Sequence, residues 1–127
     1  MGQTHVTVEI KTLIKGKKSY ENLFLVDTGA VHCFVPTRAL KKLGVAVEGQ
    51  FDCELADGTV QVFDYGFIRA KFMGQETVCH AIFAPDKAEP LLGVVALENT
   101  GFAVDPRTKA LKRLHAHPLK GFRSRRR

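Results

Sequence analysis

Hydrophobic and polar residues alternate along most of this chain, in short segments separated by turn-forming residues. Val6, Val8 and Ile10 alternate with polar neighbours, which is the pattern of a half-buried β-strand. Similar segments recur about every 8–12 residues, and this spacing favours an all-β barrel or sandwich. The expected strands cover 6–10, 20–26, 32–35, 51–55, 59–63, 67–73, 77–84, 102–104 and 110–114.

Two short helices are expected among these strands. Thr37 is expected to be the N-cap of a helix over 38–43, and Gly44 is expected to end it. A second helical pattern lies within 91–98, and Gly101 is its expected C-cap. The sequence therefore predicts a mainly β domain with a minor helical part.

The expected strand over 20–26 leads directly into Asp27, Thr28 and Gly29. A buried strand that ends at this point would hold a carboxylate at its tip. Gly29 permits close backbone approaches that a side chain would block, and the Thr28 hydroxyl can hydrogen-bond within the turn. The tripeptide therefore indicates a rigid, partly buried catalytic carboxylate. The structural alternative is an ordinary turn with a capping acid.

A second motif lies far downstream, where Leu91-Leu92-Gly93 precedes the second helical pattern. Together with the segment 27–30 and with Phe34-Val35-Pro36, it gives the chain a resemblance to the retroviral-type (retropepsin-like) aspartic proteases. The resemblance covers about residues 6–114 and is greatest to the small stand-alone members found in prokaryotes. It rests on the order and separation of the motifs.

This resemblance implies a small closed β-barrel of the retropepsin type with one or two short helices, active as a two-fold homodimer. It implies that Asp27 is the catalytic acid. It also implies a supporting loop and a segment packed behind that loop. The loop residues are Thr28, whose hydroxyl would brace the two loops across the axis, Gly29, whose backbone would lie along the substrate, and Ala30; the backing residues are Leu91, Leu92 and Gly93.

A hairpin is predicted where Ala56, Asp57 and Gly58 separate two strand-like segments, because Asp-Gly favours a tight turn. By resemblance it stands where the flap of the family would close over a peptide. An ordinary β-turn is the alternative, since the family's flaps are richer in glycine. The residues 30–33 also differ from the small polar residues usual after the motif, which affects the pocket beside the acid.

Peptide hydrolysis by this family needs two carboxylates that share a proton, one acting as base toward water and one polarising the carbonyl. The chain has one Asp-Thr-Gly, and Asn99-Thr100-Gly101 lacks the acid. The pair must therefore come from Asp27 of two subunits, which predicts a homodimeric aspartic endopeptidase acting on peptides or proteins without a cofactor. The alternative is a non-catalytic dimeric binding or assembly module of the same fold.

Net charge separates the body of the chain from its end. Five of the 19 basic side chains lie in the last eight residues, and the other 14 nearly balance the 13 acidic ones. We therefore expect a protease domain over 1–116 and a basic, disordered tail over 117–127 that makes at most a weak contact with nucleic acid or an acidic partner. An RNA-binding barrel that binds through the tail is less favoured, because the body is near neutral and lacks an aromatic stacking pattern such as paired exposed Phe or Tyr on one strand.

The cysteines are expected to be reduced, packed thiols of a cytoplasmic protein. Cys33, Cys53 and Cys79 are odd in number and widely spaced, with no Cys-x-x-Cys pair. His32 and His80 could suggest a metal, but further ligands at metal spacing are missing, so no metal is expected. No signal peptide or membrane segment is expected either.

Overall fold

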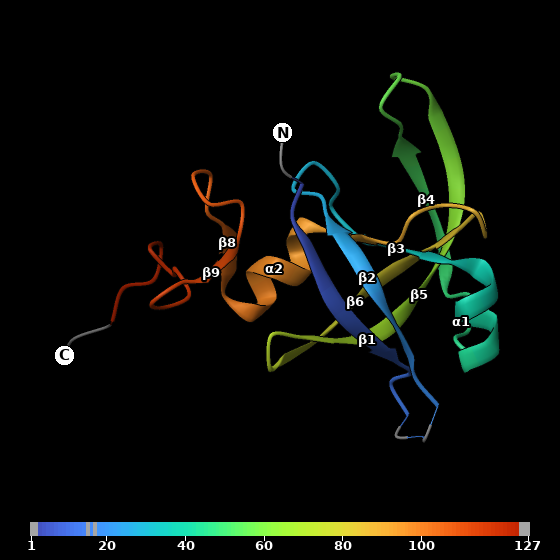
Figure 1. The fold of residues 1–127 in the computed structure, drawn as a ribbon, viewed down its shortest axis with the longest axis horizontal. Helices are drawn as coiled ribbons and strands as arrows, with labels where there is room; N and C mark the ends of the chain where they lie inside the picture. The colour runs from blue at the N-terminus through green and yellow to red at the C-terminus, as the bar shows by residue number, and fades with distance from the viewer. Residues whose placement is uncertain (1–2, 15, 17, 125–127) are drawn as a thin grey trace.

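The computed structural model describes residues 3–14, 16 and 18–124. Short strands dominate this part of the chain, and two helices of seven residues accompany them (Figure 1). In chain order the elements are β1 (His5–Lys11), β2 (Tyr20–Val26), β3 (Cys33–Pro36), α1 (Thr37–Leu43), β4 (Gly49–Glu54), β5 (Val60–Phe72), β6 (Gln75–Ala84), β7 (Leu91–Leu92), α2 (Val94–Thr100), β8 (Phe102–Val104) and β9 (Leu111–Arg113).

Seven strands form one sheet in the order β1-β2-β7-β3-β6-β5-β4. An additional antiparallel pairing of β1 with β5 joins the two sides of this sheet, so that six of its strands form a ring and β4 lies outside it. β2 pairs with β7, and β3 with β6, in parallel; the other pairings are antiparallel. The predicted all-β fold with two short helices is confirmed, and the ring is compatible with a small barrel.

The core lies inside this ring because the alternating apolar residues of the strands face one another there. Val8 and Ile10 of β1 are fully buried, whereas Thr7 is exposed and Glu9 is half-buried. Helix α2 contributes Ala96 and Leu97 to the same core. The largest fully buried side chains are Phe24, Ile10, Leu40, Ile68, Leu92, Leu97, Val8, Val35 and Cys33.

β5 differs from the sequence prediction, which divided it into strands over 59–63 and 67–73. It is one strand of 13 residues, and its long course is visible in Figure 1. Gly66 lies in its middle, where a Cβ would stand 2.5 Å from the Ala46 carbonyl oxygen and 2.7 Å from the Val45 side chain. The glycine therefore admits a close crossing of the segment 45–46 and does not interrupt the strand.

The expected N-cap of the first helix is also wrong. Pro36 occupies the N-cap position, and the Thr37 hydroxyl donates a hydrogen bond to the Ala84 carbonyl oxygen at 2.7 Å. The free N–H of Arg38 is satisfied instead by a loop carboxylate, Asp86 Oδ1, at 2.7 Å. A distant residue therefore does the capping, which no local motif could indicate.

Both helix ends are as predicted. Gly44 follows α1 with φ 85°, and Gly101 follows α2 with φ 77°. In this left-handed conformation the glycine N–H bonds back to carbonyls of the last turn, and a side chain would be strained.

The C-terminal hairpin of β8 and β9 forms a separate two-stranded sheet, as expected from the two strand signals. From 115 to 124 the described chain contains neither helix nor strand, and 125–127 lie outside the described residues. The boundary between domain and tail remains a prediction. Within the described residues, no helix has the length and apolar character needed to span a membrane.

Candidate active site

Asp27 stands immediately after β2, at the point where the buried strand ends in a turn. Its Oδ1 accepts a hydrogen bond from the Gly29 N–H at 2.9 Å, and its carbonyl oxygen accepts one from the Ala30 N–H at 3.1 Å. A Cβ on Gly29 would lie 3.3 Å from Asp27 Oδ1, which is tight enough to displace the carboxylate. Glycine at this position therefore permits both the turn and the orientation of the acid.

The segment 91–95 holds this loop from behind. β7 pairs in parallel with the end of β2, and the Asp27 N–H donates to the Leu92 carbonyl oxygen at 3.0 Å. The N–H of Val94 donates to Ala30 O at 2.8 Å, and that of Val95 donates to Val31 O at 3.2 Å. Backbone hydrogen bonds thus join two segments that are far apart in the sequence.

Gly93 lies between these hydrogen bonds and makes the closest backbone approach in this region. A Cβ at Gly93 would stand 2.4 Å from the His32 carbonyl oxygen and 2.7 Å from that of Val31. Its φ of −84° is open to any residue, so the requirement for glycine is one of space. Two backbone segments can therefore lie in contact only because this residue has no side chain.

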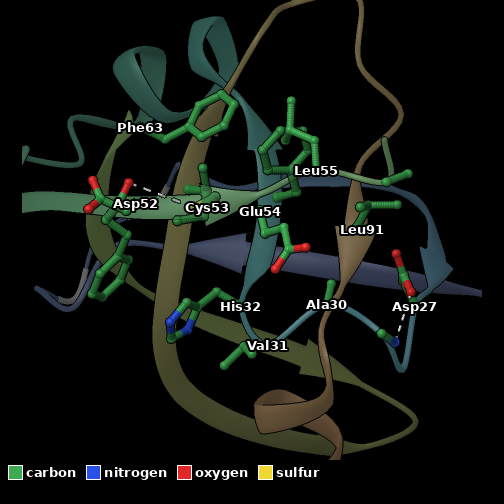
Figure 2. Close-up of a pocket in the computed structure, with 15 residues that line it drawn as sticks. Asp27, Ala30, Val31, His32, Asp52, Cys53, Glu54, Leu55, Phe63 and Leu91 are labelled. Carbon is green, nitrogen blue, oxygen red and sulfur yellow. Dashed lines mark hydrogen bonds between the residues drawn. The ribbon is translucent and has the colours of Figure 1, made fainter. Parts of the chain in front are cut away.

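The carboxylate opens on a cavity of about 790 Å³ beneath the β4–β5 hairpin. Figure 2 shows Asp27 and Ala30 toward one end of this cavity and His32, Asp52 and Phe63 toward the other. Most of its wall is apolar, which suits an extended ligand with apolar side chains. The lining residues are Asp27, Gly29, Ala30, Val31, His32, Phe34, Phe51, Asp52, Cys53, Glu54, Leu55, Ala56, Phe63, Ile82 and Leu91.

The structure brings together part of the residue set predicted for the site. Of the predicted residues, Asp27, Gly29, Ala30, Ala56 and Leu91 line the cavity. Leu92 and Gly93 are buried behind the loop, whereas Thr28, Asp57 and Gly58 are exposed. The predicted roles of these residues in catalysis and substrate binding stay predictions.

The hairpin tip is a defined turn. The Leu55 N–H donates to Thr59 O at 2.8 Å, and Gly58 has φ 86°. Asp57 Oδ1 accepts hydrogen bonds from the Thr59 hydroxyl at 2.6 Å and from the Thr59 N–H at 3.0 Å, and these bonds lower the pKa of Asp57. The polar tip therefore has a structural use in closing the turn.

An aromatic cluster between the loop and the hairpin was not found from the sequence. The His32 ring stacks on Phe51 at 4.7 Å between centroids, and Phe51 stacks on Tyr65 at 4.1 Å. His80 of β6 meets His32 edge-on at 4.9 Å and lies tilted against Phe67 at 4.5 Å. The alternation of Tyr65 and Phe67, which places both rings on one face of β5, was a signal for this cluster in the sequence.

His32 is the titratable member of this cluster that borders the cavity. Burial lowers the pKa of His32, and the neighbouring His80 lowers it further. Among the described residues, the buried Nδ1 atom of His32 has no hydrogen-bond partner. The imidazole is therefore held mainly by ring stacking and in its neutral form.

His32 and His80 carry imidazole nitrogens of the kind that bind metal ions. In the part of the chain that the structure describes, no group of three or more His, Cys, Asp or Glu side chains is arranged to hold a metal ion. The two imidazoles pack as aromatic rings in the cluster described above.

Comparisons with known proteins bear on the fold. No protein-family model matches the chain, and no curated protein matches it. Among solved structures, the chain is similar to the EIAV protease complexed with the inhibitor HBY-793, with a TM-score of 0.62 and 18% identity over 79% of this chain and 89% of that one. It is also similar to the foamy viral protease-reverse transcriptase in complex with an RNA/DNA hybrid, with a TM-score of 0.56 and 15% identity over 75% of this chain.

The chain spans only 11% of the length of that foamy viral protein. The foamy viral protease-reverse transcriptase dRH in complex with ds DNA gives a TM-score of 0.51 at 14% identity, over 72% of this chain and 14% of that one. At such identities the likeness concerns the fold alone. These structures, together with the mainly β architecture described above, show that the chain has a retroviral-protease-like fold.

Proposed function

We propose that this protein is a homodimeric aspartic endopeptidase whose active site combines Asp27 with Asp27 of the partner subunit. The observation that carries the proposal is the fixed Asp27 carboxylate, held by the Gly29 N–H and opening on a largely apolar cavity under a hairpin. The retroviral-protease-like fold supports the same conclusion. The particular resemblance of this chain to the small stand-alone retropepsin-like proteases of prokaryotes remains a prediction.

The dimer is required by the chemistry. One ionised carboxylate takes a proton from water as the oxygen attacks the peptide carbonyl. One protonated carboxyl polarises the carbonyl oxygen and afterwards helps to protonate the leaving nitrogen. The chain supplies a single Asp-Thr-Gly, so a two-fold axis beside the loop would bring the second carboxylate. Thr28 and Gly29 are exposed on this loop, which leaves them accessible to a second copy.

The cavity and the hairpin suggest the substrate class. An extended peptide would lie between the Asp27 loop and the β4–β5 hairpin, and its backbone would pair with the hairpin as an added strand. The apolar wall, which includes Phe34, Phe63 and Ile82, would receive apolar side chains. Closure of the hairpin would exclude water from the reacting carbonyl.

The decisive test is cleavage of a diverse peptide mixture from acid to neutral pH, with the products identified by mass spectrometry. We expect cleavage by the wild type, inhibition by a transition-state-type aspartic protease inhibitor, and loss of cleavage in Asp27→Asn. The matched control is Glu21→Gln, which neutralises an exposed carboxylate on β2, the strand that leads into Asp27. Sedimentation equilibrium should give a dimer for all three proteins.

Three outcomes would contradict the proposal in different ways. Wild-type turnover in Asp27→Asn would remove the catalytic assignment. A stable dimer that cleaves no peptide and does not bind the inhibitor would favour the non-catalytic binding module. Cleavage by a monomer would show that the second carboxylate does not come from a partner subunit.

A further inference from the structure

Two of the three cysteines meet inside the sheet. The Sγ atoms of Cys33 and Cys79 lie 3.8 Å apart, and the two residues are 1% and 6% exposed. They belong to β3 and β6, which pair in parallel with Cys33 opposite Ala81, two residues after Cys79. Both cysteines are free thiols. A disulfide requires its sulfurs at about 2.05 Å, so a small approach of the two strands would join them.

This thiol pair shares its support with the Asp27 loop. The Gly93 backbone N–H faces the Cys33 thiol and lowers its pKa. Its neighbours Leu92 and Val94 are hydrogen-bonded to Asp27 and Ala30. The same short backbone segment therefore contacts the thiol pair at one residue and the candidate catalytic loop at the adjacent ones.

We propose that Cys33 and Cys79 are a redox-active dithiol that peroxides oxidise to a reversible intramolecular disulfide. The Cys33 thiolate attacks one oxygen of hydrogen peroxide, the O–O bond breaks, and a sulfenic acid forms with release of hydroxide, which takes up the thiol proton as water. Cys79 then attacks the Cys33 sulfur, the S–O bond breaks, and a second water leaves. Two thiols are oxidised and one peroxide is reduced.

The surroundings assign the first step to Cys33. Contact with the Cys79 thiol lowers the pKa of Cys33, burial raises it, and the nearby Gly93 N–H lowers it. Contact with Cys33 and burial both raise the pKa of Cys79. These directions favour the thiolate on Cys33, so we assign the attack on peroxide to Cys33.

Cys33 lies on the core side of β3, because its chain neighbours His32 and Phe34 both line the cavity beneath the hairpin and side chains alternate along a strand. A small oxidant therefore reaches its sulfur through local opening of the sheet. Cys53 is the third thiol and lies half-buried on β4, where it also lines that cavity. It provides an internal control, because it is open to the same oxidant and lacks a thiol partner among the described cysteines.

Oxidation should affect stability and, if the proposed function is correct, activity. A cross-link between residues 46 positions apart restricts the unfolded chain and raises the melting temperature. Bond formation shortens the sulfur separation by about 1.7 Å, whereas a catalytic arrangement tolerates displacements of about 0.5 Å. The activity effect rests on the proposed function, and we expect a loss of cleavage rate on the order of 10- to 100-fold.

The test treats the wild type with hydrogen peroxide, quenches it, and alkylates the remaining thiols in denaturant before peptide mapping. We expect alkylation at Cys53 alone and a peptide pair linked through Cys33 and Cys79. We also expect a higher melting temperature, and dithiothreitol should reverse both changes. Alkylation of Cys33 and Cys79, their separate over-oxidation, or links to Cys53 or between chains would overturn the proposal.

Variants separate the disulfide from other oxidation. Cys53→Ser should keep the linked peptide and the rise in melting temperature, whereas Cys33→Ala and Cys79→Ala should lose both. If either alanine variant fails to fold, the linked peptide and the melting temperatures of the wild type and Cys53→Ser still show whether the disulfide between Cys33 and Cys79 forms. Because the readouts are peptide mapping and melting, they hold even for a protein that cleaves no peptide. A disulfide that forms without changing an observed cleavage rate would overturn only the link to activity.

Discussion

Gly93 and His32 lie in backbone contact, so close that a Cβ on Gly93 would stand 2.4 Å from the His32 carbonyl oxygen. This contact fixes the distance between the segment that backs the active loop and the segment that leaves it. We expect Gly93→Ala to destabilise the fold by about 1–3 kcal/mol, since neither backbone can move away cheaply. Chemical denaturation would measure this change.

The control for that prediction is Gly121→Ala. A Cβ at Gly121 meets no atom within 4 Å, so this exchange should leave the free energy of unfolding nearly unchanged. A Gly93→Ala variant as stable as Gly121→Ala would show that the two segments are not held as described.

Stability should depend on pH through His32. Its pKa is lowered in the folded protein, so the unfolded chain binds a proton first as the pH falls. The contribution of neutral His32 is therefore complete above the ordinary value of 6.5 and decreases as the pH falls from there through the lowered folded value. His32→Phe keeps a ring against Phe51 and should lose less stability over this window.

Melting temperatures of wild type and His32→Phe, measured from neutral to acid pH, would check this prediction. His5→Phe is the control, because His5 is an exposed residue paired with Glu89 outside the aromatic cluster. If the melting temperatures of wild type and His32→Phe decrease in parallel as the pH falls, His32 is not the source of the pH dependence.

The hairpin tip should loosen when Asp57 is replaced by alanine. The Thr59 N–H and hydroxyl both lose their acceptor, so we expect faster amide hydrogen exchange at Thr59 with little change in the core. Because the pKa of Asp57 is lowered, the same loosening should appear in the wild type only as the pH falls through that lowered value. Asp52→Ala, on the neighbouring strand β4, is the control and should leave Thr59 exchange unchanged.

Removal of residues 117–127 should leave the fold and the cleavage of neutral peptides unchanged. The five basic residues from Lys120 onward would raise only the affinity for acidic ligands, through a contribution that weakens as salt increases. Binding to a single-stranded oligonucleotide, measured at rising salt, would check this. Loss of dimerisation in the shortened chain would show that these residues belong to the subunit interface.

Local signals in the sequence predicted most elements of the fold. The Asp27 turn and the glycines that end α1 and α2 each depend on a few adjacent residues. The conformation at these positions could therefore be predicted from the local sequence. The contact of Leu92 with Asp27 was expected from the family resemblance, and the structure provides its hydrogen bond.

The remaining features depend on which distant strands become neighbours. The approach of Cys33 to Cys79 follows from the parallel pairing of β3 with β6, and two isolated cysteines give no sign of it. The stacking of His32 on Phe51 likewise depends on where the β4–β5 hairpin lies over the loop. The predicted division of β5 near Gly66 was wrong. A glycine that makes room for a crossing backbone segment cannot be distinguished in the sequence from a glycine that ends a strand.

The continuity of β5 has a mechanical consequence for ligand binding. Its first half pairs with β4 in the hairpin, and its second half pairs with β6 and, over 69–71, with β1. On its β5 side the hairpin therefore has no hinge loop at its base, and its tip can move only by bending a strand that is anchored in the core. A peptide bound at the tip would restrain that bending, and slower amide exchange at Ile68 and Ala70 would report occupancy of a site that neither residue lines.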